Sequence, residues 1–279
     1  MDGAIKSAGK LLLLPFLLFF AFFLVPLAVV FVSSLLSADT GNFSLVNYAN
    51  ILLDQYHWDV ILTTFRIGII TTVICLLLGY PLAWYLVRVV RSRAWMRICI
   101  VILVVPLFTS NIVRSFGWMI MMGRNGLVND FLQWLNVIDR PMRLLGTETG
   151  ILIGLVYILL PFAVMSIGTA LSRMDRSLEH ASHDLGASPA HTFFYVTLPL
   201  SLPGVAAGAI MVFALAVSAY VTPALLSGGR ITVLPMLIYQ QYSTVFNFNF
   251  GGALSIVLLV LTLTLVAVAN SLGKVKEGN

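Results

Sequence analysis

Six long apolar runs dominate this 279-residue sequence and restrict what it can fold into. Each is long enough to cross about 30 Å of hydrocarbon as an α-helix of roughly 20 residues. Four runs contain no charged residue, the second contains only Arg66 and the third only Arg114. Because a charge at the centre of a membrane helix costs about 2.5 to 3.5 kcal/mol, this pattern is typical of membrane-spanning helices. The runs cover residues 11–37, 62–87, 98–122, 149–171, 200–226 and 251–272.

The composition agrees with a membrane protein. Hydrophobic residues make up 59% of the chain and charged residues 10%, whereas about a quarter of the residues in a soluble domain are charged. We therefore expect an all-α integral membrane protein in which residues 1–279 form a single transmembrane domain. Lys6 and Lys10 precede the first run as they would in a signal peptide. The run is too long for one and lacks a small-x-small cleavage site, so we expect it to remain as a membrane anchor.

Basic residues between the runs predict the orientation of the chain. The net charge is +5, but Lys and Arg lie at the ends of apolar runs rather than on one solvated face, which argues against a nucleic-acid-binding protein. Because cytoplasmic loops are enriched in Lys and Arg, both termini are predicted to be cytoplasmic. The predicted cytoplasmic set is Lys6, Lys10, Arg88, Arg91, Arg93, Arg97, Arg173, Arg176, Lys274 and Lys276, and the outer set is Arg124, Arg140, Arg143 and Arg230.

Two predicted outer segments, 44–54 and 126–138, carry apolar residues at helical spacing. They are expected to form short helices on the outer surface of the membrane. Within the runs, Pro161, Pro203 and Pro223 are expected to bend or break their helices, because proline removes a backbone donor and clashes with the preceding turn.

Few residues carry recognisable chemistry of their own. The chain has no GxxxxGK[ST], HExxH or GxSxG motif, so it lacks the residues expected for nucleotide-phosphate binding, zinc-dependent hydrolysis and acyl transfer. Cys75 and Cys99 fall in or beside different runs and are expected to be packing residues. His180 and His183 lie three residues apart, but without a carboxylate or thiol set a solvated helix face is favoured over a metal site. We expect no catalytic residue, metal or cofactor in this chain.

Polar residues within the runs mark a candidate solute path or gate. Arg114, in the segment SNIVRSFGW, is expected about a dozen ångströms from the outer end of its helix at 1.5 Å per residue. An unpaired arginine there is costly, so Arg114 either lines a solute path or outer gate, or bonds to carbonyls of neighbouring helices. Arg66 lies near its helix end and is expected to extend towards the interface. The candidate residues are Ser110, Arg114, Trp118, Tyr220, Thr222 and Pro223.

A polar segment between the fourth and fifth runs, about residues 175–199, is the second candidate site. A charged start at Asp175 is followed by small residues, by Gly186, which permits a sharp change of direction, and by Leu198 and Pro199 where the next run begins. The pattern predicts a short helix, a turn and a second amphipathic piece. A membrane protein that has no energy-coupling site of its own, but presents a compact helical segment outside the membrane, is suited to being moved by a soluble partner.

This segment resembles the EAA loop of permease subunits from binding-protein-dependent ABC importers. Gly186 stands where the family has its glycine, and Val196, Leu198 and Pro199 stand where it has I-x-LP. The EAA triplet falls on residues 180–182, so His180 takes the glutamate position, and either His180 or the preceding Glu179 supplies that contact. The resemblance implies that the ATPase-coupling residues are Glu179, His180, Ala181, Ser182, Asp184, Gly186, Ala187 and Pro199.

Further motifs resemble the polyamine (spermidine and putrescine) group of these permeases and cover most of the chain from the third run onwards. They are PLFTSNIVRSFGW from Pro106, NGLVN from Asn125, LPF at Leu160, DLGAS at Asp184, LPLSLPGVAAG at Leu198 and VTPALLSGG at Val221.

The resemblance implies a six-helix type I importer permease of the MetI-like fold in the bacterial cytoplasmic (inner) membrane. Its implied partners are a second, similar permease, two cytoplasmic ATPase subunits that hold ATP and Mg²⁺, an external solute-binding protein and the lipid bilayer. No nucleic-acid partner is expected. In this family the EAA loop is a coupling helix seated in a groove of the ATPase.

Several alternatives remain open. The candidate path contains no acidic residue, so the solute is either a polyamine or another compound, such as an opine, an amino-acid-like compound, a phosphonate or a ferric ion. An ion-coupled secondary transporter or a channel is disfavoured because the six runs contain no Asp, Glu or His to serve as a relay. A membrane enzyme is disfavoured because no catalytic constellation is present.

Overall fold

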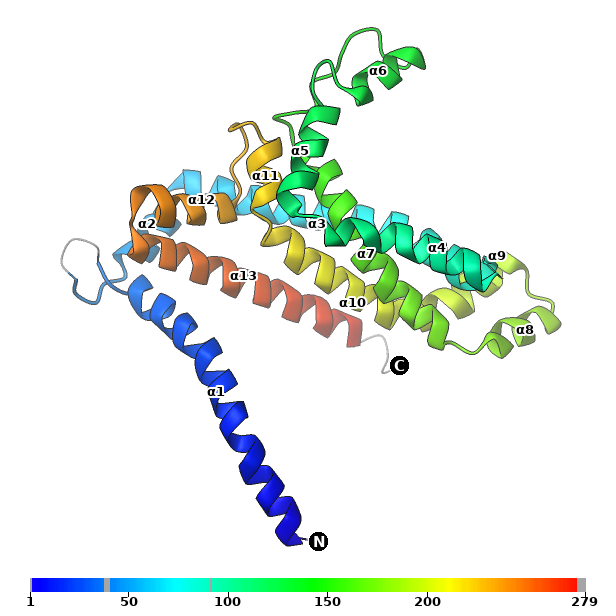
Figure 1. The fold of residues 1–279 in the computed structure, drawn as a ribbon, viewed down its shortest axis with the longest axis horizontal. Coiled ribbons are helices and arrows are strands. Elements are labelled where there is room, and N and C mark those ends of the chain that lie inside the picture. Colours follow the sequence, from blue (N-terminus) through cyan, green and yellow to red (C-terminus); the bar gives the residue numbers. More distant parts are fainter. Residues whose placement is uncertain (1, 38–40, 91, 275–279) are drawn as a thin grey trace. The chain divides into compact units, whose positions relative to one another are not determined.

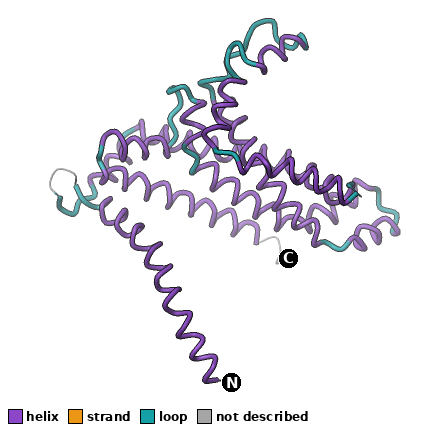
Figure 2. Tube along the Cα trace, in the orientation of Figure 1, coloured by secondary structure: helices purple, strands orange, loops and turns teal. Residues whose placement is uncertain are grey.

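The computed structural model describes residues 2–37, 41–90 and 92–274, and α-helices make up most of it (Figure 1). Within these residues there is no β-strand, only an isolated bridge between Leu36 and Phe43 (Figure 2). Arg91 and Lys276, which contributed to the predicted orientation, lie outside the described residues. The helices are α1 Asp2–Ser34, α2 Val46–Leu53, α3 Gln55–Trp84, α4 Arg93–Val104, α5 Asn111–Met121, α6 Leu127–Trp134, α7 Glu148–Arg173, α8 Arg176–Asp184, α9 Pro189–Thr192, α10 Leu198–Val217, α11 Val221–Leu226, α12 Leu234–Gln240 and α13 Phe248–Lys274.

Five of the six predicted spans are helices long and apolar enough to cross a membrane. In the described residues these helices cover Leu17–Ser34, Gln55–Val89, Glu148–Arg173, Pro189–Val217 and Phe248–Ser271. They include π-helical turns at Tyr85–Val89 and Phe193–Thr197. The sequence therefore predicted the helical membrane fold correctly, although the ends of individual helices differ.

The third predicted span, 98–122, is not a straight helix. It is divided into α4 and α5, which meet at an angle of 100°. A 3₁₀ turn at Val105–Phe108 contains Pro106, which has no backbone N–H, and Thr109 is extended. The Ser110 hydroxyl then accepts a hydrogen bond from the Ile112 N–H at 3.3 Å and caps the new helix. Arg114 still lies about two turns before the end of its helix, because α5 ends at Met121, but the straight span assumed for it is bent.

The fifth predicted span, 200–226, ends earlier than expected. Helix α10 stops at Val217, and α11 begins at Val221. The break places Pro223 in the first turn of α11, where its missing N–H costs no hydrogen bond within the helix. By contrast, α7 and α10 continue through Pro161 and Pro203.

The described chain contains two compact units. The first comprises the described parts of residues 1–59 and 237–261. Here the Asn47 amide donates to the carbonyls of Ser34 at 3.0 Å and Leu36 at 2.9 Å, which fastens α2 to the end of α1. Only 6% of the Leu17–Ser34 segment is buried within the structure.

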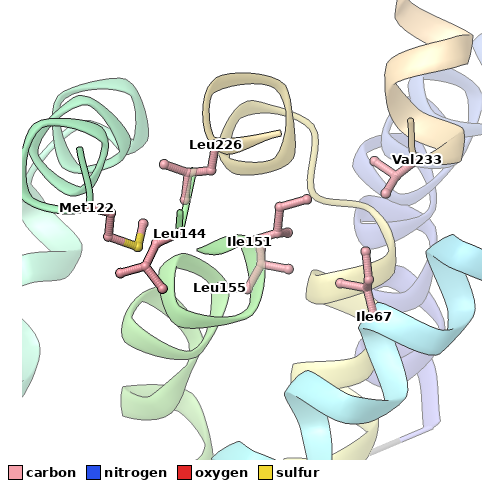
Figure 3. Close-up of a cluster of buried hydrophobic side chains, with 7 residues drawn as sticks. All are labelled: Ile67, Met122, Leu144, Ile151, Leu155, Leu226 and Val233. Carbon is pink, nitrogen blue, oxygen red and sulfur yellow. The ribbon is translucent and has the colours of Figure 1, made fainter. Parts of the chain in front are cut away.

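The second unit comprises the described parts of residues 60–236 and 262–279. Helices α7 and α10 run side by side in it (Figure 1). A Cβ atom added at Gly204 of α10 would lie 2.3 Å from the Ala170 Cβ of α7, so glycine is what permits this approach. Figure 3 shows one buried cluster from this unit. It consists of Ile67, Met122, Leu144, Ile151, Leu155, Leu226 and Val233.

The predicted outer segments 44–54 and 126–138 contain α2 and α6 respectively, which confirms that each forms a short helix. Helix α6 is fastened by the buried side chain of Asn129. Its amide donates to the carbonyls of Gly123 and Met142, both at 3.0 Å, and its oxygen accepts from the Met142 N–H at 2.9 Å. Helix α12 was not predicted.

We predict that Gly204→Ala lowers the free energy of unfolding by about 1 to 3 kcal/mol, because the added methyl group overpacks the α7–α10 contact. Thermal unfolding of the purified protein in detergent measures the effect. Gly117→Ala is the matched control, since a Cβ there meets no atom within 4 Å. Equal unfolding temperatures for the two variants would contradict the close approach.

Candidate functional site

The 175–199 segment, called here the 175–199 loop, folds as the sequence predicted. Helix α8 is followed by a turn and by the short helix α9. The Asp175 carboxylate accepts from the Ser177 N–H at 2.9 Å and caps α8. The backbone N–H of Ser177, and then its hydroxyl, lower the pKa of Asp175, so the charged cap persists until the pH falls below the usual range of an aspartate. Gly186 has a φ of 83°, a left-handed conformation that allows the sharp change of direction expected there.

Glu179 ties the 175–199 loop to the rest of the second unit. Its Oε1 atom lies 3.2 Å from Nε of Arg88, which follows α3. The same oxygen accepts a hydrogen bond from the Thr197 hydroxyl at 3.0 Å, just before α10. The Arg88 side chain is 7% exposed and that of Glu179 is 19% exposed. One carboxylate therefore joins the loop to the end of α3 and to the start of α10, in surroundings where the ion pair is screened little by water.

Two more hydrogen bonds reinforce this attachment, and a third lies within the loop. Arg176 donates to the Val87 carbonyl at 2.7 Å, and Arg88 Nη2 donates to the Met174 carbonyl at 3.4 Å. The hydroxyls of Ser182 and Thr192 are 2.9 Å apart and connect α8 with α9. Arg88, Arg176 and Thr197 were not among the predicted site residues, because no local pattern indicates contacts between such distant parts of the chain.

The predicted coupling residues divide into two groups. Glu179 is turned into the protein and pairs with Arg88, while Ser182 and Ala187 are half-buried. His180, Ala181, Asp184, Gly186 and Pro199 are exposed. Leu185, which the sequence did not single out, is 89% exposed. The exposed residues of α8 and its turn thus include two large apolar side chains, Leu178 and Leu185, among mixed polar groups.

A second site lies where the two broken spans meet. Helix α11 packs against α5, and the hydroxyls of Ser115 and Thr222 lie 3.1 Å apart between them. Beside this contact is a pocket of about 430 Å³. Its lining is mostly apolar with a few polar side chains, as in many ligand sites. The lining residues are Leu107, Asn111, Arg114, Leu155, Ile158, Leu159, Phe162, Leu215, Ser218, Ala219, Tyr220, Val221 and Thr222.

Three of the six predicted path residues, Arg114, Tyr220 and Thr222, line this pocket together. The other three do not line it. Ser110 caps α5, Trp118 packs edge-on against Tyr157 at a ring distance of 5.4 Å, and Pro223 is buried in α11. Asn111 and Ser218 also line the pocket and were missed. Asn111 precedes Arg114 by one helical turn, and this spacing was the available signal.

Comparison with known proteins identifies the family. Residues 75–275 match the model of the "Binding-protein-dependent transport system inner membrane component" family. The chain belongs to this family. It is therefore a multi-pass inner membrane permease of an ABC importer.

Similar proteins include two spermidine/putrescine transport system permease proteins named PotB. The permease is 35% identical to PotB of Salmonella typhimurium strain SL1344 over 239 residues, which cover 84% of this chain and 82% of that one. It is 34% identical to PotB of Escherichia coli K12 over 239 residues, with coverage of 84% and 86%. The similar proteins are transport permeases.

A solved structure supports the fold. The permease superimposes with a TM-score of 0.79 on a chain of a bacterial alginate ABC transporter in complex with an alginate pentasaccharide-bound periplasmic protein. The match covers 96% of the permease and 94% of that chain at 17% sequence identity, so it supports the fold alone.

Other predicted side chains of the permease are also placed. Arg66 of α3 reaches Glu148 at the start of α7 and forms an exposed ion pair with it, a partner that the sequence analysis did not foresee. Cys75 is buried in an apolar cluster, and Cys99 packs against another. Both thiols are free, which confirms that they are packing residues.

We predict that Glu179→Gln loosens the 175–199 loop by about 1 to 3 kcal/mol, because the buried Arg88 charge loses the opposite charge it pairs with. Hydrogen exchange of the α8 amides in the purified permease measures the change, and faster exchange is expected. Asp184→Asn is the control, because it neutralises an exposed carboxylate on the same helix. Unchanged exchange in Glu179→Gln would show that the ion pair does not hold the loop.

Proposed function

We propose that this ABC importer permease takes up polyamines such as putrescine or spermidine. The observation that carries this proposal is the identity of 34 to 35% with two PotB proteins over 84% of the chain. Such similarity extends well beyond the 175–199 loop that importer permeases of many solutes share. Opines, amino-acid-like compounds, phosphonates and ferric ion are the alternative solutes to test.

The proposed machine contains a second, similar permease, two cytoplasmic ATPase subunits that bind ATP and Mg²⁺, and an external solute-binding protein. The similar alginate transporter, which is in complex with a periplasmic protein, supports the last partner. The 279-residue sequence has no nucleotide-binding motif, which supports ATP hydrolysis in separate subunits rather than in this chain. In this arrangement the termini and the 175–199 loop are cytoplasmic.

Within this machine the 175–199 loop transmits the movement of the ATPase subunits. Its exposed residues, including His180, Asp184 and Leu185, contact the ATPase, while Glu179 fastens the loop to its own permease. The attachment through Arg88 and Thr197 supports this division, because a movement of α8 is then passed to the ends of α3 and α10. ATP binding supplies the difference in contact energy between two states of the permease.

The pocket that contains Arg114 forms part of the solute path. Its place between the broken spans supports this role, because irregular backbone inside a membrane occurs where it is buried in protein or lines a cavity. The solute is selected mainly by the external binding protein, so the path has to admit the solute and need not bind it tightly.

We expect that Gly186→Val and Asp184→Arg leave membrane insertion intact but abolish coupling. A β-branched residue at a φ of 83° is strained by about 1 to 3 kcal/mol, and Asp184→Arg reverses a charge on the exposed surface. Membrane abundance, ATPase retention and solute uptake are measured on one preparation. Normal uptake in both variants, or loss of the permease from the membrane, would overturn the coupling role.

Gly186→Asn separates two causes of the Gly186 effect. Asparagine tolerates a positive φ better than valine, and no atom of this chain lies within 4 Å of an added Cβ. Uptake close to wild type in Gly186→Asn assigns the loss in Gly186→Val to backbone strain. Loss in both variants assigns it to close approach of an ATPase subunit.

The solute is tested with the cognate binding protein and the reconstituted transporter. We expect the binding protein to bind putrescine or spermidine and the complete transporter to accumulate it with ATP. The panel includes an opine, an amino acid, a phosphonate and ferric ion as competitors. Accumulation of one of these without polyamine uptake would refute the proposed solute, and accumulation without ATPase subunits would refute the ATP-driven mechanism.

A further inference from the structure

The Arg114 guanidinium is incompletely paired within the part of the chain that the structure describes. Its Nη2 atom donates to the side-chain oxygen of Asn111, one turn earlier in α5. Its Nε and Nη1 atoms are buried and have no hydrogen-bond partner among the described residues. In particular, no described carbonyl accepts from them, so this chain does not provide the backbone contacts expected of a purely structural arginine.

The surroundings of Arg114 supply no negative charge. Among the described residues that line the pocket, the polar side chains are Asn111, Ser218, Tyr220 and Thr222, and none is acidic. Asn111 already accepts from Nη2, and Thr222 is paired with Ser115. The remaining lining is mainly aliphatic, with Phe162. Buried charges in proteins are paired, and an arginine cannot escape the cost by losing its proton.

Arg66 provides an internal comparison. It is the other arginine within the six apolar runs, and its guanidinium pairs with Glu148 of the same chain. It is also more than half exposed, at 56%. The exposed Arg66 guanidinium therefore has a carboxylate partner, whereas the buried Nε and Nη1 atoms of Arg114 have none in the described part of the chain. An unpaired charge costs more free energy when it is buried, so Arg114 needs such a partner more than Arg66 does.

We propose that the pocket beside Arg114 is a carboxylate site whose carboxylate comes from outside this chain, either from the solute or from the second permease subunit. Its placement in the solute path rests on the proposed function. A carboxylate matches the planar guanidinium and accepts strong, charge-assisted hydrogen bonds from it.

The proposed solute indicates which of the two sources supplies the carboxylate. Polyamines carry no carboxylate, so for a polyamine importer the second permease subunit supplies it. The ammonium groups of an entering polyamine then compete with Arg114 for the same carboxylate. While an ammonium group holds the carboxylate, the Arg114 guanidinium is without it, so the carboxylate returns to Arg114 once the polyamine has passed.

The first test is a structure of the assembled transporter with its ATPase subunits and binding protein, determined without solute and with putrescine. We expect a carboxylate oxygen of the second permease at about 2.9 Å from Nε or Nη1 of Arg114 in the empty state. A third structure with γ-aminobutyrate, in which a carboxylate replaces one ammonium group of putrescine, tests the other source. Only water or backbone carbonyls at both nitrogen atoms in all three structures would overturn the proposal.

The second test uses substitutions in the reconstituted transporter. Arg114→Gln is expected to lower uptake at least about tenfold with assembly retained, because it removes the charge that the carboxylate pairs with. Arg66→Gln is the matched control and is expected to lower uptake much less. Arg114→Glu is expected to abolish uptake, and replacement of the identified partner carboxylate by lysine is expected to restore part of it.

The outcomes separate this proposal from the proposed solute. Rescue by the second-subunit lysine identifies the subunit as the source. Uptake of γ-aminobutyrate but not of putrescine, with its carboxylate on Arg114, supports the carboxylate site and refutes the polyamine function. Wild-type uptake in Arg114→Gln refutes the carboxylate site and leaves the polyamine function standing.

Discussion

Backbone hydrogen bonding in hydrocarbon is the constraint on which the arrangement of this permease depends. A helix satisfies its own N–H and C=O groups, so any break inside the membrane has to be compensated by neighbouring groups. The two breaks described here, at the Pro106 turn and before Pro223, lie on elements that pack against each other. Ser110 caps one new helix, and Ser115 and Thr222 bond across the contact. The same interruptions bring Asn111, Arg114 and Tyr220 to one pocket.

Much of the fold could be predicted from the sequence because the membrane signal is summed over many residues. About 20 apolar residues without a charge specify a span whatever their neighbours are. The positive φ of Gly186 was also predictable, because glycine in a polar turn after a helix has few other uses. The positions of the helix breaks were harder to predict. Pro106 and Pro223 lie where their apolar runs are interrupted, whereas Pro161 and Pro203 lie within continuous helices. Composition alone does not distinguish these pairs.

The site was predictable only in part. Their position as polar residues within apolar runs put Arg114, Tyr220 and Thr222 in one set, and the structure places them around one pocket. The sequence could not distinguish them from Ser110 and Trp118, which are close to Arg114 in sequence but do not line the pocket. Ser110 caps α5, and Trp118 packs against Tyr157. It also missed Arg88, whose ion pair with Glu179 joins residues far apart in sequence. No periodicity or spacing reports such a contact, since it exists only after α3 and α7 have packed.

The pairing of Glu179 with Arg88 separates two tasks within one short helix. Attachment to the permease depends on buried groups such as Glu179, whereas the outward surface consists of other residues, among them His180 and Leu185. Substitutions on the outward surface therefore leave the attachment intact. A permease built in this way can exchange residues of its outward surface, such as His180, without altering the buried ion pair that holds the helix in place.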